Sequence, residues 1–553
     1  MKQGYKGRKL MFMLISAMLC LALVVAGCSS GGGSNSGGSQ SGSTSGGSGG
    51  SQGGGSQQPA APQNEGPPKG GILRVGTQVG PNNLGDPTIV LSQNDPNFAA
   101  PAVERLFRRD SSGTPVPYLA EKYEVSDDQL SITIWLKQGI QFHDGAPFNA
   151  EAVKWNLDRY IATGRAELAK VKDVAVVDEY TVKLSLSEYD SLLLSYLSAI
   201  PGMMVSPKSL EEKGSEWADA NPVGTGPYKI VRWEKDDRVI YERNDNYWQE
   251  GMPYLDGIEM IIIPDAMSLA AAFMNGEVDV VFGIDPKTAL DLQAAKFQVH
   301  ASEQAASMLS LLPDSNNEGS VYTNLKVRQA VAHAIDFEAI AKTLGNGFFE
   351  ASNQLAVNGS WAYNPNVKGY PYDPEKAKQL LAEAGYPNGF STTLYAQNTE
   401  GYRNVLTAVQ AYLKEVGINA EVDLMDQGRY HTLVTGGPEK GGWKDGLAII
   451  PFTINPNELG AWSRLLGPEV SHIRLPSVYN PDPVKELIAK ATVTSDQNEL
   501  IQVVHELQRV QADEFAMAYW IYGQKSISAN QDYVYDTNWH TPQWTPELAY
   551  IKK

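Results

Sequence analysis

A long tract of low complexity divides this chain into two unequal parts. Residues 29–58 contain only Gly, Ser, Gln, Asn and Thr, and a Pro-rich stretch continues to Pro68. This composition offers no apolar surface whose burial would offset the entropy of ordering, so it predicts a flexible tether. Folding is expected in the body from residue 70 to residue 553, which is too long for one ordinary domain and predicts two lobes.

The segment before the tether has the pattern of an export signal. Cations and no acidic residue occupy its start, an apolar run follows from Leu10 to Ala26, and Gly27 precedes Cys28. A cysteine directly after small residues is typical of a lipobox, so residues 1–27 are predicted to be removed and Cys28 to carry lipid. A membrane-spanning anchor of marginal length is the alternative. The only other cysteine, Cys20, falls in the removed segment, so the mature chain is expected to have no disulfide.

The charge of the chain limits its partners. Its 63 acidic residues outnumber its 45 lysines and arginines, which gives a formal net charge of −18. Nucleic acid requires basic patches to meet its phosphates, so no nucleic-acid partner is expected. No apolar run after Cys28 is long enough to span a bilayer, so the body is expected to be attached to the membrane by lipid alone.

The folded body mixes strands with helices. Residues 131–136 alternate with period two, and residues 228–243 predict a hairpin turned at Lys235-Asp236-Asp237. Asn149 predicts the start of a helix with Val153, Leu157 and Tyr160 on one face. Asp373-Pro374 predicts the start of another helix, which ends at Gly385. This mixture predicts an α/β protein.

Catalytic motifs are scarce, and each candidate lies in the wrong context. The string G-x-S-x-G occurs at residues 46–50, inside the tether. His505-Glu506 lacks the second histidine that zinc proteases place four residues on, and the seven histidines show no metal-ligand spacing. The sequence therefore predicts no enzyme, no cofactor and no metal centre.

Four stretches of the body together carry a more specific signal. They are Tyr118–Val153 with its run Gly139-Ile140-Gln141-Phe142-His143-Asp144-Gly145, Pro222-Val223-Gly224-Thr225-Gly226-Pro227-Tyr228 followed by Asn244–Trp248, Val327–Asp336, and Tyr372–Pro387. In this order they resemble the family 5 solute-binding proteins, the peptide, nickel and oligopeptide receptors of ABC importers. Most of these are scaffold motifs. We interpret His143-Asp144-Gly145 as a turn that fixes the next helix, not as a ligand or a base.

The resemblance implies a two-lobed fold like that of periplasmic binding proteins (type II, cluster C), in which hinge-connected α/β lobes enclose the ligand and lobe I carries an extra subdomain. The implied limits are 1–27 for the signal peptide, 28–69 for the linker, 70–313 for lobe I, 314–522 for lobe II and 523–553 for a return to lobe I, with crossings near 308–313 and 516–522. It also implies a monomeric receptor on the outer face of the cytoplasmic membrane, lipid-anchored as in Gram-positive bacteria. Closure on the ligand would precede docking on the ABC permease subunits.

The ligand class stays open. Peptide receptors of the family hold the α-amino group with an aspartate shortly before an Asp-Pro pair. Here the corresponding pair is Asn455-Pro456, and no carboxylate lies between Ile449 and Ile454. An ammonium without a counter-charge would be costly in a closed cleft. Peptide remains the first expectation, with Asp426, Asp445 or Glu458 as the substitute carboxylate.

The candidate ligand-binding residues are aromatic or polar side chains near predicted strand ends. An aromatic ring can stack on a sugar, which makes an oligosaccharide or another polar solute the alternative ligand, and Arg403 can meet a carboxylate. A nickel chelate is a third ligand class, and ligand sensing in signalling is an alternative to import. The candidates are Phe98, Trp361, Tyr402, Arg403, Trp443, Phe452, Asn455 and Trp462.

Overall fold

The computed structural model describes residues 66–89, 95–110, 113–435, 442–453, 458–468, 475–539 and 544–552. These residues belong to one compact unit, Glu65–Lys553. The predicted signal peptide, the lipidation site Cys28, the tether and the candidate Asn455 lie outside the described residues. Among the described helices, none combines the length and the apolar character that crossing a membrane requires.

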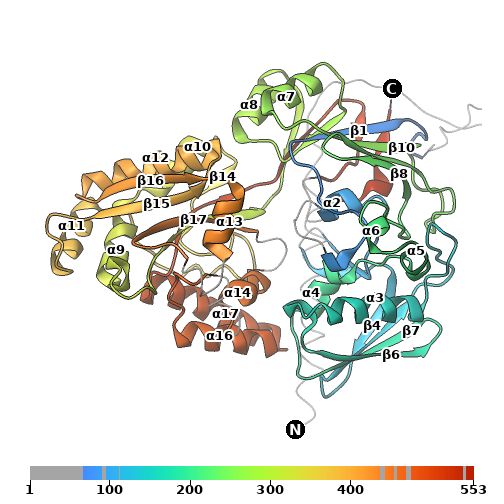
Figure 1. The fold of residues 1–553 in the computed structure, drawn as a ribbon, viewed down its shortest axis with the longest axis horizontal. Coiled ribbons are helices and arrows are strands. Elements are labelled where there is room, and N and C mark those ends of the chain that lie inside the picture. The colour runs from blue at the N-terminus through green and yellow to red at the C-terminus, as the bar shows by residue number, and fades with distance from the viewer. Residues whose placement is uncertain are drawn as a thin grey trace, which may run out of the picture. The chain divides into compact units, whose positions relative to one another are not determined.

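Lobe I is built on a seven-stranded sheet that combines distant parts of the chain (Figure 1). Its strand order is β12 (Gln298–Ala301), β19 (Ile527–Asn530), β11 (Val280–Phe282), β1 (Ile72–Thr77), β10 (Gly257–Ile262), β9 (Arg238–Arg243) and β8 (Tyr228–Glu234). Strand β1 runs parallel to β10 and β11, whereas β19 pairs antiparallel with β11 and β12. The predicted hairpin is confirmed as β8 and β9, with Asp236 in the left-handed region at its turn.

Short helices complete lobe I around this sheet. They are α2 (Asp95–Ala99), α4 (Leu193–Leu197), α5 (Pro207–Lys213), α6 (Ser215–Ala218), α7 (Ala266–Met274) and α8 (Pro286–Ala294). Two small antiparallel pairs, β2 (Phe107–Arg109) with β3 (Pro115–Pro117) and β20 (Val534–Tyr535) with β21 (Tyr550–Ile551), border it.

A four-stranded antiparallel sheet forms the subdomain of lobe I. Its order is β4 (Ala120–Val125), β5 (Ser131–Leu136), β7 (Thr181–Leu186) and β6 (Val171–Asp178), and α3 (Ala150–Ala162) packs against it. The predicted alternation of β5 is confirmed, because Ile132, Ile134 and Leu136 are all buried. The predicted start of α3 is also confirmed: the Asn149 side chain accepts a hydrogen bond from the backbone N–H of Ala152 at 3.1 Å.

The His143 turn ties this subdomain to the loop before β8. The His143 Nε2 lies 2.9 Å from the carbonyl oxygen of Gly226, and the His143 N–H donates to the carbonyl of Gly224 at 2.9 Å. Burial lowers the pKa of His143 to about 4, so the ring is neutral at physiological pH. These contacts connect two of the sequence motifs and agree with a structural role for the turn.

Lobe II is a six-stranded sheet with helices on both faces (Figure 1). Its order is β14 (Phe349–Glu350), β18 (Tyr519–Gln524), β13 (Ser307–Pro313), β17 (Gly446–Thr453), β15 (Ser391–Gln397) and β16 (Asn419–Met425). One face packs on α9 (Leu325–Ala334), α10 (Phe337–Gly345), α11 (Pro374–Glu383) and α12 (Glu400–Glu415). The other packs on α13 (Gln427–Thr435), α14 (Glu458–Leu466), α16 (Asp482–Val493) and α17 (Gln497–Arg509). The predicted helix at Asp373-Pro374 is confirmed as α11, with Gly385 in the left-handed region after it.

The chain crosses between the lobes at two adjacent segments, whose positions differ from those expected. Strand β13 pairs with β17 and β18 along its length, so 307–313 belongs to lobe II and the first crossing precedes residue 307. Strand β18 reaches Gln524 in lobe II and β19 begins at Ile527 in lobe I, so the second crossing lies at 525–526. An apolar strand such as β13 is buried on both faces in either lobe, and its pattern therefore does not show which sheet receives it. The Ser302 N–H donates to the Ser526 carbonyl at 2.9 Å, which joins the two crossings.

Candidate functional site

The carboxyl ends of three lobe II strands meet beside the crossings. Strands β15, β16 and β17 are parallel, so Gln397, Met425 and Thr453 end at the same edge of the sheet, which we call the carboxyl edge. Thr453 pairs with Ser307, the first residue of lobe II after the first crossing. Ligands of open α/β sheets bind outside the carboxyl ends of strands, so this edge is the candidate site.

Strand β17 is only half paired as it reaches the carboxyl edge. On one side β13 pairs with it from Leu447 to Thr453, but on the other side β15 pairs with it only from Gly446 to Ala448. From Ile449 onward its second side has no strand partner among the described residues, although the Ile449 carbonyl accepts a hydrogen bond from the Tyr430 hydroxyl at 2.6 Å. Pro451 and Thr453 are exposed there. Unpaired backbone groups on a strand are a template for another extended chain.

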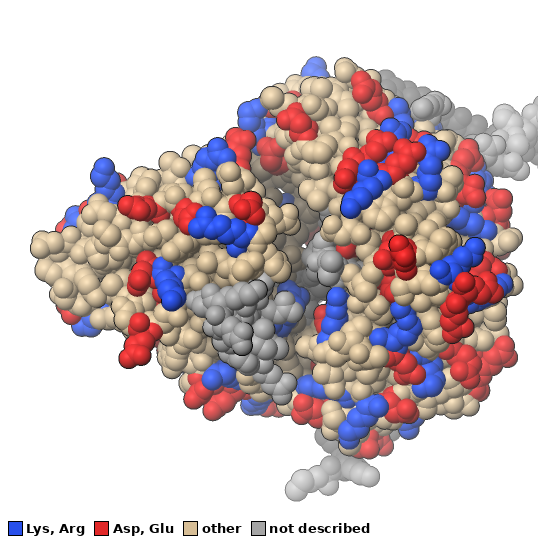
Figure 2. All heavy atoms as spheres, in the orientation of Figure 1, with Lys and Arg blue, Asp and Glu red and all other residues tan. Residues whose placement is uncertain are grey.

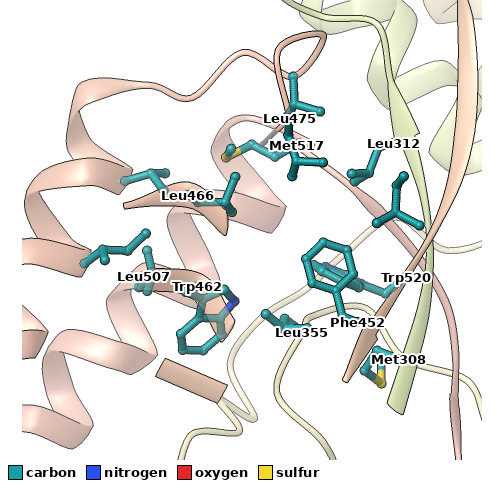
Figure 3. Close-up of a cluster of buried hydrophobic side chains, with 14 of the residues drawn as sticks. Met308, Leu312, Leu355, Phe452, Trp462, Leu466, Leu475, Leu507, Met517 and Trp520 are labelled. Carbon is teal, nitrogen blue, oxygen red and sulfur yellow. The ribbon is translucent and has the colours of Figure 1, made fainter. Parts of the chain in front are cut away.

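The Phe452 ring points away from this open side and into the core of lobe II. Side chains alternate along a strand, so Ala448, Ile450 and Phe452 share one apolar cluster. Phe452 is buried and packs edge-on against Trp520, with ring centroids 5.3 Å apart (Figure 3). Trp462 of α14 is fully buried in the same cluster, and Trp361 packs against it. The structure thus brings Phe452, Trp462 and Trp361 together as support beneath the sheet.

Two cavities lie within single lobes. One, in lobe II, is lined mainly by apolar residues that include Leu312, Phe452 and Trp520. The other, in lobe I, is lined by Glu104, Arg108, Glu547 and their neighbours. Each has a volume of about 20 Å³, which is room for about one water molecule. Neither cavity is large enough to hold a peptide or a sugar.

Two further candidates lie away from the carboxyl edge. Trp443 precedes β17 at the opposite end of the strand; it is buried, and its carbonyl accepts a hydrogen bond from Ser477 Oγ at 2.7 Å. Phe98 lies in α2 within the core of lobe I, where its carbonyl accepts a hydrogen bond from the Tyr241 hydroxyl at 2.5 Å. Neither side chain presents a ring face to solvent.

Tyr402 and Arg403 lie at the carboxyl edge, as their position after a strand suggested. Helix α12 follows β15 directly, and Thr399 caps it by accepting a hydrogen bond from the Tyr402 N–H at 3.2 Å. Tyr402 packs against the second lobe II core, and burial raises the pKa of its hydroxyl. Arg403 is exposed and donates from Nη2 to Asn398 Oδ1 at 2.9 Å.

The structure distinguishes the three carboxylates proposed for a ligand ammonium. Asp445 precedes β17, and an eight-residue strand of about 3.3 Å per residue places it about 25 Å from the carboxyl edge. Asp426 follows β16 at that edge; it is exposed, and its Oδ1 accepts a hydrogen bond from the Arg429 N–H at 3.0 Å. The side chain of Glu458 lies outside the described residues. Asp426 is thus the one of the two described candidates that lies at the carboxyl edge.

Helix α4 of lobe I contacts lobe II, which sequence reasoning missed. Leu192 is buried in the core cluster of lobe II, and the Ser191 N–H donates to the Thr492 carbonyl at 3.0 Å. Tyr196 packs against the core of lobe II and that of the subdomain. The apolar run 192–194 was the available signal, but an apolar run does not show which surface will cover it. We call α4 and these contacts the lobe junction.

Metal ligands do not gather in the part of the chain that the structure describes. Within it, no group of three or more His, Cys, Asp or Glu side chains is arranged to hold a metal ion. A chelate that brings its own ligands would need other contacts, such as charged side chains.

Comparison with known proteins identifies relatives over most of the chain. The family model for bacterial extracellular solute-binding proteins, family 5 Middle, matches residues 114–438. The glutathione-binding protein GsiB of Escherichia coli O1:K1 is 35% identical over 407 residues, which are 71% of this chain and 77% of that protein.

Solved structures with different ligands share the fold. The periplasmic binding protein DppA from Helicobacter pylori, in complex with the peptide STSA, has a TM-score of 0.76 at 24% identity and covers 88% of this chain and 99% of its own. NikZ from Campylobacter jejuni, in complex with Ni(L-His), has a TM-score of 0.72 at 21% identity, with 86% and 97% covered. Because one fold accommodates a peptide and a nickel chelate, the fold alone does not identify the ligand.

Proposed function

The chain belongs to the bacterial extracellular solute-binding proteins of family 5, and from that premise we propose that its ligand is a short peptide. As a member of the family it is a solute receptor of an ABC importer that acts outside the cytoplasm, and it is not an enzyme. Its two lobes have the fold expected from the resemblance. The peptide, the lipid anchor and the residues of the site are our proposals.

The open side of β17 carries the peptide proposal. An extended peptide alternates N–H donors and C=O acceptors along its backbone, and this pattern matches a strand whose second side has no described strand partner from Ile449 to Thr453. Pro451 lacks an N–H and offers only its carbonyl, so the pairing would be interrupted there. A sugar has no such repeat. The glutathione-binding relatives support a ligand of tripeptide size.

Asp426 is the proposed partner of the ligand's α-amino group. It lies at the carboxyl edge, and its exposure leaves the carboxylate accessible to a ligand. Replacing Asp426 by Asn keeps the cap of α13 but removes the charge, so peptide affinity is expected to fall about 10-fold, the effect of a hydrogen bond to a charged group. If Asp426→Asn bound a peptide with a free α-amino group, and the N-acetylated form of that peptide, as tightly as the wild type does, the ammonium would belong to another carboxylate.

Closure around the crossings is the proposed mechanism of capture. Gly523 lets the crossing segments approach closely, because a Cβ there would lie 2.8 Å from Ala305 Cβ. A ligand that touches both lobes stabilises the closed form, in which α4 contacts lobe II. The closed receptor would then be the form that the permease recognises.

Attachment by lipid on Cys28 completes the proposal. The Gly- and Ser-rich tether that follows has a root-mean-square span of about 35 Å, which would let the body swivel above the outer face of the cytoplasmic membrane. Mass spectrometry of the membrane-extracted protein should find a diacylated Cys28 at the new N-terminus. A Cys28→Ala variant is expected in the soluble fraction.

The oligosaccharide alternative loses support from the placement of two candidate rings. Trp443 and Trp462 are buried in the lobe II core, so neither offers a face for stacking on a sugar. Ligand sensing in signalling uses the same closure and stays an alternative to import.

Thermal unfolding of the purified protein tests the ligand class. A panel of di- to hexapeptides, glutathione, oligosaccharides and nickel–histidine would be added at increasing concentration. A ligand that binds only the folded form stabilises it by about 2.7 kcal/mol at one hundred times its dissociation constant. Peptides are expected to raise the midpoint. A rise with oligosaccharides alone, or with nickel–histidine alone, would overturn the peptide proposal.

A further inference from the structure

Arg105 lies two residues before β2, and Arg109 is the last residue of that strand. The Nε atom of Arg105 is buried and has no hydrogen-bond partner, and Arg105 forms no ion pair among the described residues. Burial lowers the pKa of Arg105 to about 10. Arg108, on the same segment, forms an ion pair with Glu547 at 3.4 Å. Among the described residues, Arg105 therefore lacks the ion pair that its neighbour has, although it lines the same small cavity as Glu104 and Glu547.

Arg109 adds a second positive charge beside Arg105. Its Nε donates to Ser198 Oγ at 3.0 Å, and its Nη2 donates to the Ser195 carbonyl at 3.4 Å. Burial, and then the positive charge of Arg105, lower the pKa of Arg109 to about 9. Both arginine residues are nevertheless partly accessible to solvent. The positive charge of Arg109 adds to the cost of burying the charge of Arg105, and an anion beside Arg105 would lower that cost.

The pair lies next to the lobe junction. Ser195 is part of α4 and Ser198 follows it, and Tyr196 between them packs against both lobes. Burial, and then the negative charges of Asp190 and Glu167, raise the pKa of Tyr196, and the positive charge of Arg464 on lobe II opposes that rise. Figure 2 shows Lys and Arg atoms beside the hollow between the two lobes.

We propose that Arg105 and Arg109 bind a carboxylate of the ligand at the lobe junction. Guanidinium groups hold carboxylates through paired, charge-assisted hydrogen bonds, and the buried Nε of Arg105 is a donor that the protein leaves unused. The inference rests on the proposed peptide function and extends it. With its ammonium at Asp426 of lobe II and its carboxylate at Arg105 and Arg109 of lobe I, a short peptide connects both lobes. Binding is thereby coupled to closure.

Calorimetric titration with trialanine and with its C-terminal amide tests the assignment. The two probes differ in one charged group. Wild-type protein should bind the acid about 10- to 100-fold more tightly than the amide, the range for hydrogen bonds to a charged group. Arg105→Met and Arg109→Met should each remove most of this preference while leaving the affinity for the amide unchanged. Arg232→Met removes an arginine that is 58% exposed on β8 and should keep the preference.

A second measurement separates this inference from the peptide proposal. Malonate, compared with sodium chloride at equal ionic strength, should raise the unfolding midpoint of the wild type and of Arg232→Met, but not that of Arg105→Met. A malonate effect without binding of any peptide would overturn the peptide function and retain the carboxylate site. Equal affinity for trialanine and its amide, or equal malonate effects in wild type and Arg105→Met, would overturn the carboxylate site and leave the peptide function standing.

Discussion

Two buried charges in lobe I are adjacent in sequence and have opposite surroundings. The Glu104 carboxylate accepts four hydrogen bonds, from the hydroxyls of Tyr118 (2.7 Å), Tyr247 (2.7 Å) and Thr225 (2.7 Å) and from the Trp248 indole (2.9 Å). The next residue, Arg105, has a buried Nε with no hydrogen-bond partner in the described part of the chain. A charge that the fold satisfies completely serves the fold, whereas one that the fold leaves short of partners is available to a ligand.

The partners of Glu104 explain why the sequence motifs are spread along the chain. Tyr118 opens the first motif, Thr225 belongs to the second, and Tyr247 and Trp248 end the stretch that follows it. All of them converge on one carboxylate, which we call the Glu104 network. The two motifs of lobe I are therefore conditions for folding that lobe, and their contacts with Glu104 give no information about the ligand.

The largest expected effect comes from breaking the Glu104 network. Glu104→Ala leaves four buried donors without an acceptor, so the free energy of unfolding should fall by about 3–5 kcal/mol. Urea denaturation at pH 7 measures this loss. Glu104→Gln keeps one acceptor oxygen, so its free energy of unfolding should fall less than that of Glu104→Ala. An alanine variant as stable as the wild type would show that water replaces the carboxylate, and the contrast with Arg105 would disappear.

The second effect is a pH dependence carried by Glu547, which lines the same cavity as Glu104. Burial, and then the negative charge of Glu104, raises the pKa of Glu547 to about 7, while Arg108 lowers it. The folded state thus holds a proton that the unfolded state releases near pH 4.5. This contribution to stability is complete below about pH 4.5 and is lost as the pH rises through about 7, an effect of about 2–3 kcal/mol.

Glu547→Gln should remove this pH dependence of the free energy of unfolding. The difference in that free energy between the variant and the wild type at each pH isolates the contribution of Glu547. His143 acts in the opposite sense, because its pKa is lowered to about 4 and its unfolded form takes up protons below about pH 6.5. Thermal or urea unfolding from pH 4.5 to pH 8 measures both proteins. If the stabilities of the wild type and of Glu547→Gln changed equally with pH over this range, the Glu547 carboxyl would have an ordinary pKa.

A smaller effect, of opposite sign, is expected at Arg105. Arg105→Met removes a desolvated charge that has no protein counter-charge, so the free energy of unfolding should stay unchanged or rise by about 1 kcal/mol. Arg108→Met is the matched control, since it removes the partner of Glu547 and should destabilise the fold. Urea denaturation without ligand compares them. If Arg105→Met lowered the free energy of unfolding as much as Arg108→Met does, Arg105 would have a structural role.

Sequence reasoning located the scaffold better than the site. The period of 131–136, the hairpin of 228–243 and the cap at Asp373 are local patterns, and each is confirmed. The crossings were misplaced because β13 is apolar throughout, and neighbouring residues do not reveal which sheet receives it. Trp443 and Trp462 were proposed for their chemistry alone, yet burial depends on tertiary contacts. Arg105 was missed for a related reason, since its surroundings come from residues distant in sequence, such as Met203 and Glu547.

The smallest expected effect concerns Arg403, the arginine that the sequence did single out. Arg403 is exposed and contacts Asn398, so Arg403→Met should change the free energy of unfolding by less than about 0.5 kcal/mol. If the ligand carboxylate binds at Arg105 and Arg109, the preference for trialanine over its amide should also survive this change. Calorimetric titration of Arg403→Met and of Arg105→Met with trialanine and its amide decides which arginine binds the ligand carboxylate. A preference lost only in Arg403→Met would move the carboxylate to the carboxyl edge of lobe II. The ligand would then lie along β17 and bridge the lobes through its side chains.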